Sequence, residues 1–304
     1  MSVPPRDAAT VILVRDSRDE RGEPGIEVCM LRRNLAAEFS AGAYVFPGGS
    51  VDAEDRAPAA AALCRGRTDA EASARLGIES GGLAFWVAAL RECFEEAGVM
   101  VAGTPDDAGA DGYAPLDTRD PEMVRRLAVH RRDLNRGLTG LVRVCEQENL
   151  VLAADAVHYV SHWITPELSP RRYDTRFFIT AAPPGQVAEH DEGETIATVW
   201  VRPGQALAAS ALAEVDLLPP TLANLRNIES FRSTDEVMAW ARQVTDVPTV
   251  LPIVLIEDGH VLVLRPGDAG YEEAAADLAA SDGPPDQQLT AAARQLWGPK
   301  TDQG

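Results

Sequence analysis

The chain has 304 residues, 45% of them hydrophobic, which is enough to bury the core of one large domain with or without an appendage. Its formal net charge of −19 argues against nucleic acids and acidic membranes as partners, because basic protein surfaces normally hold both. We find no apolar run of membrane-spanning length, no secretory signal and no paired cysteine spacing, so we expect a cytoplasmic protein with reduced cysteines.

The first third of the chain predicts a short sheet followed by helices. Apolar runs indicate strands at residues 9–14, 26–31 and 43–46, the last of which leads into the glycine pair Gly48-Gly49. The alanine-rich segment 57–75 is predicted to be helical. A longer helix is expected to follow and to end at Gly98, with another strand near residues 99–102.

The rest of the chain alternates helices and strands until its composition changes near residue 246. Residues 104–121 are rich in Asp, Gly and Pro and predict a loop. The elements expected next are a mostly helical insertion at 121–152, strands at 173–180 and 195–201, and helices at 203–213, 222–231 and 234–244.

The last part of the chain predicts a hairpin and a tail. The apolar runs 250–256 and 260–264 flank Glu257-Asp258-Gly259, which is a good turn sequence, and a loosely packed acidic tail is expected after them. We therefore expect a main domain over residues 1–245, with insertions at about 56–82 and 104–155, and a C-terminal appendage over residues 246–304.

The most informative run is Arg-Glu-Cys-Phe-Glu-Glu-Ala-Gly-Val at residues 91–99. Apolar residues at helical spacing precede and interleave it: Leu83, Trp86 or Val87, Leu90, Phe94 and Ala97. Glu92, Glu95 and Glu96 share the opposite helix face, where their like charges repel. A hard divalent cation such as Mg²⁺ converts that repulsion into coordination, and Arg91 can orient Glu95 one turn away. The alternative is a solvated acidic helix face.

This run resembles the second half of the Nudix box, the signature of hydrolases that cleave nucleoside diphosphates linked to another moiety. The family box is a Gly, five residues, a Glu, seven residues, and then Arg-Glu-hydrophobe-x-Glu-Glu-x-Gly-hydrophobe. Counted from Gly49, the early acidic position falls on Asp55, and a segment at about 56–82 separates it from Arg91. An expanded box resembles the branch of peroxisomal coenzyme A diphosphatases and their bacterial relatives, as do the runs 31–33, 42–49, 162–166 and 171–178.

The resemblance implies an α/β Nudix fold, an α/β/α sandwich on a mixed sheet, here with a helical insertion and extra C-terminal elements. It implies metal-dependent hydrolysis, with Mg²⁺ or Mn²⁺, of a diphosphate in a small nucleotide derivative, and coenzyme A or acyl-coenzyme A as the leading substrate. ADP-ribose or NADH is the alternative substrate class. A nucleotide-sensing module without catalysis is the alternative of a different class, although the glutamates are all present.

The resemblance also implies a set of metal-binding and catalytic residues. The expected metal ligands are carboxylates of one helix face and a nearby backbone oxygen: Glu92, Glu95, Glu96 and Gly49, with Gly48 as a substitute for Gly49. Glu92 is either a ligand or the general base, and Arg91 orients the acids. Outside the box, Glu194 is the candidate acid and Glu192 its rival, with a solvated acidic loop as the alternative.

Cationic and aromatic residues near strand ends are the candidates for substrate contacts: Arg32, Arg33, Phe46, Arg172 and Tyr173. One of Arg32 and Arg33 should face the cleft, because side chains alternate along a strand. The alternatives are surface ion pairs for the arginines and core packing for the rings. His158 and His162 lack a third soft ligand and are expected to be ordinary core or surface residues. A homodimer through the C-terminal hairpin is expected, with packing on its own domain as the alternative.

Overall fold

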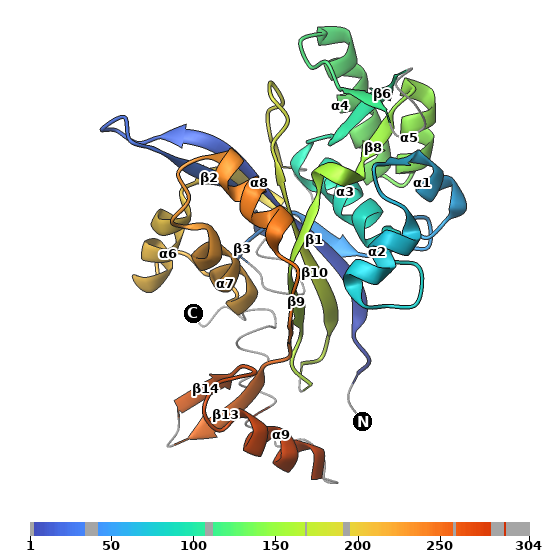
Figure 1. Cartoon of the computed structure of the whole chain (residues 1–304). Coiled ribbons are helices and arrows are strands. Elements are labelled where there is room, and N and C mark those ends of the chain that lie inside the picture. The colour runs from blue at the N-terminus through green and yellow to red at the C-terminus, as the bar shows by residue number, and fades with distance from the viewer. Residues whose placement is uncertain are drawn as a thin grey trace.

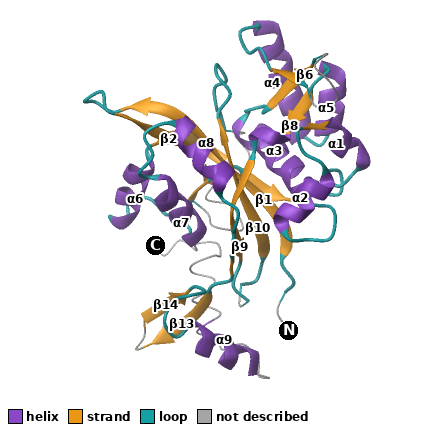
Figure 2. Cartoon of the chain, viewed as in Figure 1, coloured by secondary structure: helices purple, strands orange, loops and turns teal. Residues whose placement is uncertain are grey.

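A mixed sheet forms the centre of the protein in a computed structural model that describes residues 3–33, 42–106, 112–167, 169–190, 195–257, 260–280 and 289. The strand order is β11-β2-β1-β10-β9-β12, and β3 and β4 pair in addition with β2 and β1. Figure 1 shows this sheet between two groups of helices, and Figure 2 distinguishes strands from helices. The strands are β1 (Arg6–Arg18), β2 (Pro24–Arg33), β3 (Tyr44–Val45), β4 (Gly48–Ser50), β9 (His158–Ile164), β10 (Tyr173–Ala181), β11 (Thr195–Val201) and β12 (Thr249–Val250).

The two faces of this sheet carry separate hydrophobic clusters, because side chains alternate along each strand. On β1, Val11 and Leu13 belong to one cluster while Ile12 and Val14 belong to the other, and all four are buried. The first face is covered by α3 (Leu83–Ala97), and the second by α6 (Pro203–Ala211), α7 (Pro219–Ile228) and α8 (Thr234–Gln243). The expected α/β/α sandwich on a mixed sheet is confirmed.

The strand β4 brings the glycine pair to the middle of the sheet. It runs antiparallel to β1, with Gly48 opposite Thr10 and Gly49 opposite Ala9. A Cβ on Gly48 would lie 2.4 Å from Thr10 Oγ1 and 2.7 Å from the Ala9 carbonyl oxygen, so only glycine fits this close strand contact. The helix α3 packs on both β1 and β4, which places the glycine pair beneath it.

Several predicted elements need correction in their bounds or type. The segment 57–75 contains a short strand between two helices: α1 (Pro58–Leu63), β5 (Cys64–Arg65) and α2 (Asp69–Leu76). Its two strand residues pair with Leu152 and Ala153, and a pairing so distant in the chain leaves no local signal. The strand predicted near 99–102 begins only at Ala102, as β6 (Ala102–Pro105). The strand β9 was not among the predicted elements.

The helical insertion predicted at 121–152 is confirmed as α4 (Pro121–Asn135) and α5 (Leu141–Glu148). Beside these helices lies a second, four-stranded sheet of order β5-β8-β6-β7. Its strand β7 (Tyr113–Pro115) lies in the segment predicted to be a loop. The strand β8 (Val151–Ala153) and a short 3-10 helix (Ala154–Ala156) lead from this insertion back to β9. Figure 1 places this sheet and its helices on the side of α3.

The C-terminal hairpin is confirmed as β13 (Ile253–Glu257) and β14 (His260–Leu264), whose strands pair with each other. The tail contains a helix that was not predicted, α9 (Tyr271–Ala280), which contacts β13. The main sheet also extends past residue 245, since Thr249 pairs with His162 on β9. None of the helices within the described ranges is both long and apolar enough to cross a membrane.

Candidate functional site

The helix α3 that carries the three glutamates is enclosed on all sides. All of its residues are buried except Glu95, which is partly exposed. Glu92 and Glu96 have only 9% and 6% of their surface exposed, so the alternative of a solvated acidic face is wrong. The predicted apolar stripe is confirmed, since all of its residues are buried in the first hydrophobic cluster, including both Trp86 and Val87.

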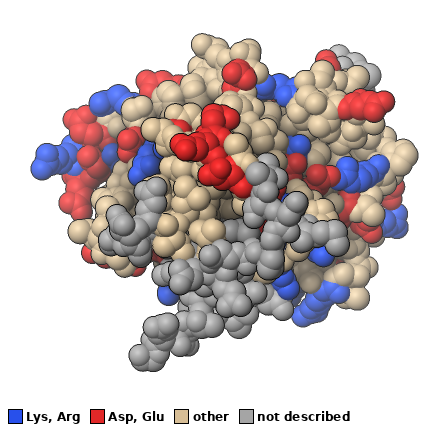
Figure 3. Space-filling view, turned by 90° about the horizontal axis from the view of Figure 1, so that it is seen from below, with Lys and Arg blue, Asp and Glu red and all other residues tan. Residues whose placement is uncertain are grey.

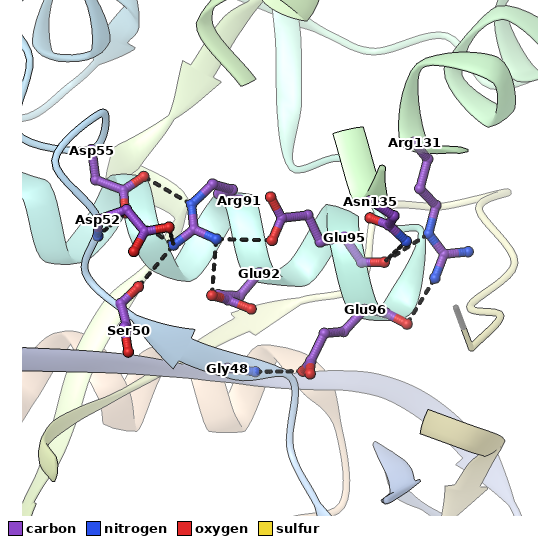
Figure 4. A network of polar contacts seen from close by, with 10 residues as sticks. All are labelled: Gly48, Ser50, Asp52, Asp55, Arg91, Glu92, Glu95, Glu96, Arg131 and Asn135. Atoms are coloured by element: carbon purple, nitrogen blue, oxygen red, sulfur yellow. Dashed lines mark hydrogen bonds and ion pairs between the residues drawn. The ribbon is translucent and has the colours of Figure 1, made fainter. Parts of the chain in front are cut away.

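Arg91 is the centre of the acidic cluster (Figure 4). Its Nε and Nη2 atoms donate to the two carboxylate oxygens of Asp55, each at 3.0 Å. Its Nη1 donates to Glu92 Oε1 at 2.9 Å and to Glu95 Oε2 at 2.8 Å. Its Nη2 also donates to the carbonyl oxygen of Ser50, at 2.8 Å. One buried guanidinium therefore orients three carboxylates and ties helix α3 to the end of β4.

The acid at the early position of the interrupted box, Asp55, is joined to Arg91 in space. Asp55 is only 4% exposed and accepts a further hydrogen bond from the Asp52 backbone N–H at 2.8 Å. After Asp55 the chain forms α1, β5 and α2 before it reaches the start of α3. The count from Gly49 pointed to this residue. The long interruption, however, gave no indication that Asp55 would still contact Arg91.

The glycine pair lies against the remaining carboxylates. The Gly48 backbone N–H donates to Glu96 Oε2 at 2.8 Å, as Figure 4 shows. A Cβ on Gly49 would lie 2.2 Å from Glu92 Oε1, which is closer than any real contact. The backbone of β4 can approach these acids only because both residues are glycines. The predicted ligand set of Glu92, Glu95, Glu96 and Gly49 is thus brought together at one place.

Both ends of α3 are held by the two insertions rather than by residues of the helix itself. At its N-terminal end, Asp69 on α2 accepts from the backbone N–H groups of Leu83 and Gly81, each at 3.0 Å. At its C-terminal end, Arg131 on α4 donates to the carbonyl oxygens of Glu95 and Glu96 at 2.9 and 2.7 Å. A carboxylate at the positive end and a guanidinium at the negative end both match the helix dipole.

The C-terminal contact has a second member, since Asn135 Nδ2 on α4 donates to the Glu95 carbonyl oxygen at 3.2 Å. Gly98 ends the helix in the left-handed conformation with φ of 71°, as predicted. A Cβ at this glycine would lie 2.8 Å from Arg131 Nη1. Sequence reasoning missed Arg131 and Asn135, because nothing in a helix of mixed charge shows which distant carbonyls it will meet.

Burial raises the pKa values of two carboxylates in the cluster. Burial, opposed by Arg91 and aided by the nearby charge of Glu95, raises the pKa of Glu92 to about 7. Burial likewise raises the pKa of Glu95, although Arg91 opposes this. Burial alone would lower the pKa of Arg91, but its bonds and charge interactions with Asp55, Glu92 and Glu95 raise it further above its ordinary value. More positive charge at this place would therefore stabilise the ionised acids.

The donor set fits a hard divalent cation chemically, because it offers carboxylate and backbone oxygens and a strand backbone that comes close. Over the described ranges, no three acidic, histidine or cysteine side chains already surround a common point. Arg91 draws Glu92 and Glu95 toward itself, and the Gly48 N–H holds Glu96. Glu194 and its rival Glu192 lie outside the described residues.

The predicted substrate contacts are spread over the sheet. Arg32 and Arg33 are partly exposed at the end of β2, opposite Ala197 and Thr195 of β11. Tyr173 is partly exposed at the start of β10, opposite Arg6. The other two predicted substrate contacts, Phe46 and Arg172, are buried.

Phe46 and Arg172 have local roles in the fold. Phe46 is 2% exposed and lies in the second hydrophobic cluster, which favours the core-packing alternative for its ring. Arg172 donates from Nε to the Thr165 carbonyl oxygen at 3.0 Å and from Nη1 to the Val3 carbonyl oxygen at 2.9 Å. His162 is an ordinary buried histidine as expected, with Nε2 2.5 Å from Asp174 Oδ1 and Nδ1 2.8 Å from Thr249 Oγ1.

The sequence matches a family model described as the NUDT19 Nudix domain, over residues 65–228, which is more than half of the chain. It is 27% identical to the acyl-coenzyme A diphosphatase NUDT19 of Homo sapiens, an alignment that covers 88% of this chain and 80% of that protein. It is 28% identical to the protein of the same name from Gallus gallus, with the same coverage.

A solved structure has the same fold. The crystal structure of a NUDIX hydrolase from Alicyclobacillus acidocaldarius superimposes with a TM-score of 0.60 and 25% sequence identity. The superposition covers 78% of this chain and 96% of that one. The matched family range contains the whole of α3 with Arg91 and its three glutamates, whereas the glycine pair and Asp55 precede it.

Proposed function

The chain belongs to the NUDT19 Nudix family and is a Nudix hydrolase, and from this premise we propose that it cleaves the diphosphate linkage of coenzyme A or an acyl-coenzyme A in a reaction that requires Mg²⁺ or Mn²⁺. The observation that carries the proposal is the Arg91 cluster, in which Asp55 and two glutamates converge across the interrupted box. The substrate is suggested by the names of the human and chicken relatives.

We assign the metal-binding role to the acids nearest the glycine pair. Glu95 and Glu96 are the proposed ligands, with Gly49 as a backbone ligand and Glu92 as either a third ligand or the general base. When bound, Mg²⁺ or Mn²⁺ neutralises diphosphate charge and makes water a stronger nucleophile at neutral pH. Glu194 remains the proposed acid from outside the box, ahead of β11.

In the proposed reaction, a water oxygen attacks one phosphorus in line and the bridging P–O bond breaks. The proton of the water passes to a carboxylate, for which Glu92 is suited by its position and by a pKa of about 7 raised through burial. Arg91 keeps Glu92 and Glu95 pointing to the same side of α3 while this proton moves. The bridging oxygen leaves with the negative charge on the departing phosphate.

The proposed contacts with the substrate are cationic and aromatic. Arg32 and Arg33 lie on the strand next to β1 and are partly exposed, so they are the proposed partners of the diphosphate. Tyr173 is the proposed stacking ring, since it too is partly exposed. Arg172 and Phe46 are weaker candidates, because their groups already contact backbone carbonyls and the core.

The test is a Mg²⁺-dependent hydrolysis screen with products identified by mass. The substrates are coenzyme A, acetyl-coenzyme A, ADP-ribose, NADH, diadenosine polyphosphates and nucleoside triphosphates. Release of 3′,5′-ADP with a phosphopantetheine fragment supports the proposal. Turnover of ADP-ribose or NADH alone keeps the diphosphate chemistry and rejects coenzyme A as substrate. Tight binding of a nucleotide without any turnover favours the non-catalytic module.

We further propose that the C-terminal segment forms a unit of its own and mediates a homodimer. Figure 1 shows β13, β14 and α9 below the main sheet, and the two strands pair with each other rather than with that sheet. Because β12 belongs to the main sheet, we place the boundary after Val250 rather than at residue 245. Light scattering across micromolar concentrations tests the dimer, and a constant monomer mass would contradict it.

A further inference from the structure

A second charged site lies at the edge of the central sheet, on the strand β9. A cavity of about 310 Å³ is lined by Arg67, Arg75, Trp86, His158, Tyr159, Ala241 and Arg242. These residues come from both helical layers, since α2 and α3 flank one face of the sheet and α8 the other. The strand β12 pairs with β9 at His162 and Trp163 and not at His158 and Tyr159, so the pocket is located beside the unpaired end.

The lining of this pocket is basic in a strongly acidic protein. Three of its seven residues are arginines, one is a histidine and none is acidic, whereas the chain as a whole carries a net charge of −19. None of the three arginines forms an ion pair with a carboxylate in the part of the chain that the structure describes. The pKa of His158 is lowered by burial and by the nearby charges of Arg242 and Arg67, which agrees with an excess of positive charge.

Two of the arginines are held in place by neutral groups, although the charges of Glu71 and Asp155 act on Arg67 from nearby. The guanidinium of Arg67 lies 4.7 Å from the centre of the Trp86 ring, and that of Arg75 lies 5.3 Å from the centre of the Tyr159 ring. Arg75 also donates to the carbonyl oxygens of Thr245 and Tyr159, at 2.7 and 3.0 Å, and to that of Val244. Stacking and carbonyl contacts orient a guanidinium without neutralising it.

The remaining donors are available for an anion. Arg67 has one long contact, from Nε to the Ala154 carbonyl oxygen at 3.5 Å, so its two terminal nitrogens keep their donors. Arg242 is exposed in the last turn of α8. Planar guanidinium groups that converge without carboxylates match the oxygens of a phosphate, which accepts several hydrogen bonds at once.

This pocket is separate from the acidic cluster. Its strand β9 is three strands away from β4 in the order β4-β1-β10-β9, which corresponds to about 14 Å in the plane of the sheet. Trp86 precedes Glu92 by six residues on α3, so the two side chains lie on different faces of the helix, about 9 Å apart along its axis. The two sites therefore share a helix but lie on different faces of it.

We propose that this sheet-edge pocket binds a phosphomonoester through Arg67, Arg75 and Arg242, at a site distinct from the acidic cluster. The phosphomonoester belongs either to a separate small molecule or to a peripheral phosphate of the substrate. Both sources offer the same dianionic group, which a guanidinium cluster recognises in the same way.

The direct test is calorimetric titration of the full chain with inorganic phosphate in a buffer that contains EDTA. Without metal, the acidic cluster repels anions, and the pocket variants below decide whether saturable binding of phosphate belongs to the pocket. We expect Arg242→Gln to weaken the binding about tenfold, and Arg67→Gln with Arg242→Gln to weaken it further. The matched control is Arg226→Gln, which removes an exposed arginine from the last turn of α7.

The proposal is overturned if the wild-type protein shows no saturable phosphate binding, or if Arg226→Gln weakens binding as much as Arg242→Gln does. Thermal unfolding of each variant checks that it is folded, and a phosphate-induced rise in melting temperature that is lost only in the pocket variants supports the site. Because these measurements use no turnover, they fail or succeed independently of the proposed hydrolase substrate.

A second arm identifies the source of the phosphate and rests on the proposed function. Steady-state hydrolysis of coenzyme A is compared with that of 3′-dephospho-coenzyme A in the wild type and in Arg242→Gln. A higher KM for coenzyme A alone in the variant assigns the phosphate to the substrate. An unchanged KM for both, with phosphate binding lost in the calorimeter, assigns it to a separate molecule.

Discussion

The acidic cluster and the sheet-edge pocket are two charged regions on one helix, and they are organised in opposite ways. At the C-terminal half of α3, one buried arginine holds three carboxylates, and Glu96 meets a backbone N–H. At the N-terminal half, three arginines surround a cavity with no acidic residue in its lining. Each region therefore has an excess of one sign, which is why we propose a ligand of the opposite sign for each.

The comparison teaches that the net charge of the chain does not describe its local fields. Figure 3 shows a face with a patch of Asp and Glu near its centre and with smaller groups of both charges toward its edges. The total of −19 argues against large basic binding surfaces, but it is compatible with a pocket lined by three arginines. Anion recognition by the proposed pocket depends on the burial and the geometry of the groups that line it.

The largest expected effect is the loss of catalysis when one proposed metal ligand is replaced. Glu96→Gln removes one proposed ligand but keeps an oxygen that can accept from the Gly48 N–H, so folding should be retained. We expect kcat of Mg²⁺-dependent hydrolysis to fall about a thousandfold, roughly 4 kcal/mol. The control is Glu79→Gln, an exposed acid shortly before α3, which should retain wild-type turnover. Full activity of Glu96→Gln would refute the assigned metal site.

The next effect concerns the arginine at the centre of the acidic cluster. Arg91→Gln leaves buried Asp55 and its neighbours without their cation, and we expect the free energy of unfolding in urea to fall by about 3 kcal/mol. Adding Asp55→Asn should recover part of this loss, because it removes a buried charge. As a control, Arg143→Gln breaks an exposed pair with Glu146 and should cost under about 1 kcal/mol.

A third prediction follows from the raised pKa of Glu92. In the unfolded chain this carboxyl releases its proton near its ordinary pKa of 4.5, but in the folded protein only near pH 7. The folded state therefore binds more protons between these values, and stability should fall by about 2–3 kcal/mol as pH rises across this window in EDTA. Urea unfolding at several pH values measures it, and Glu92→Gln should flatten the profile. A stability that rises from pH 5 to 7 would contradict the assignment.

The smallest effect concerns the arginine pocket. Arg75→Gln loses carbonyl contacts that join α2 to the end of α8, and we expect a loss of about 1 kcal/mol in unfolding free energy. The kcat of hydrolysis should fall far less than it does in Glu96→Gln, because Arg75 does not touch the acidic cluster. A drop in kcat comparable to that of Glu96→Gln would show that the two regions are one site.

The elements that the sequence predicted correctly are those with strong local signals. The runs that form β1, β2, β10, β11 and the helices α3 to α8 carry their apolar pattern within themselves. The short strand β5 was missed because it depends on pairing with β8, far along the chain. The strand β9 pairs with β10, the next strand in the chain, and was missed although its partner is near. The tail segment that forms α9 showed a polar, alanine-rich composition, which does not by itself separate a helix from a loop.

The sequence alone determined the family and its chemistry, because Arg91, three glutamates and two glycines stand in a spacing that few other functions require. Only the tertiary structure decided how Asp55 reaches Arg91 across an interruption and how Asp69 and Arg131 hold the ends of α3. It alone brought together the arginines of the sheet-edge pocket, which are spread from residue 67 to residue 242. Local patterns reflect helix and strand geometry, whereas charges that meet from distant segments are decided by the packing of the whole chain.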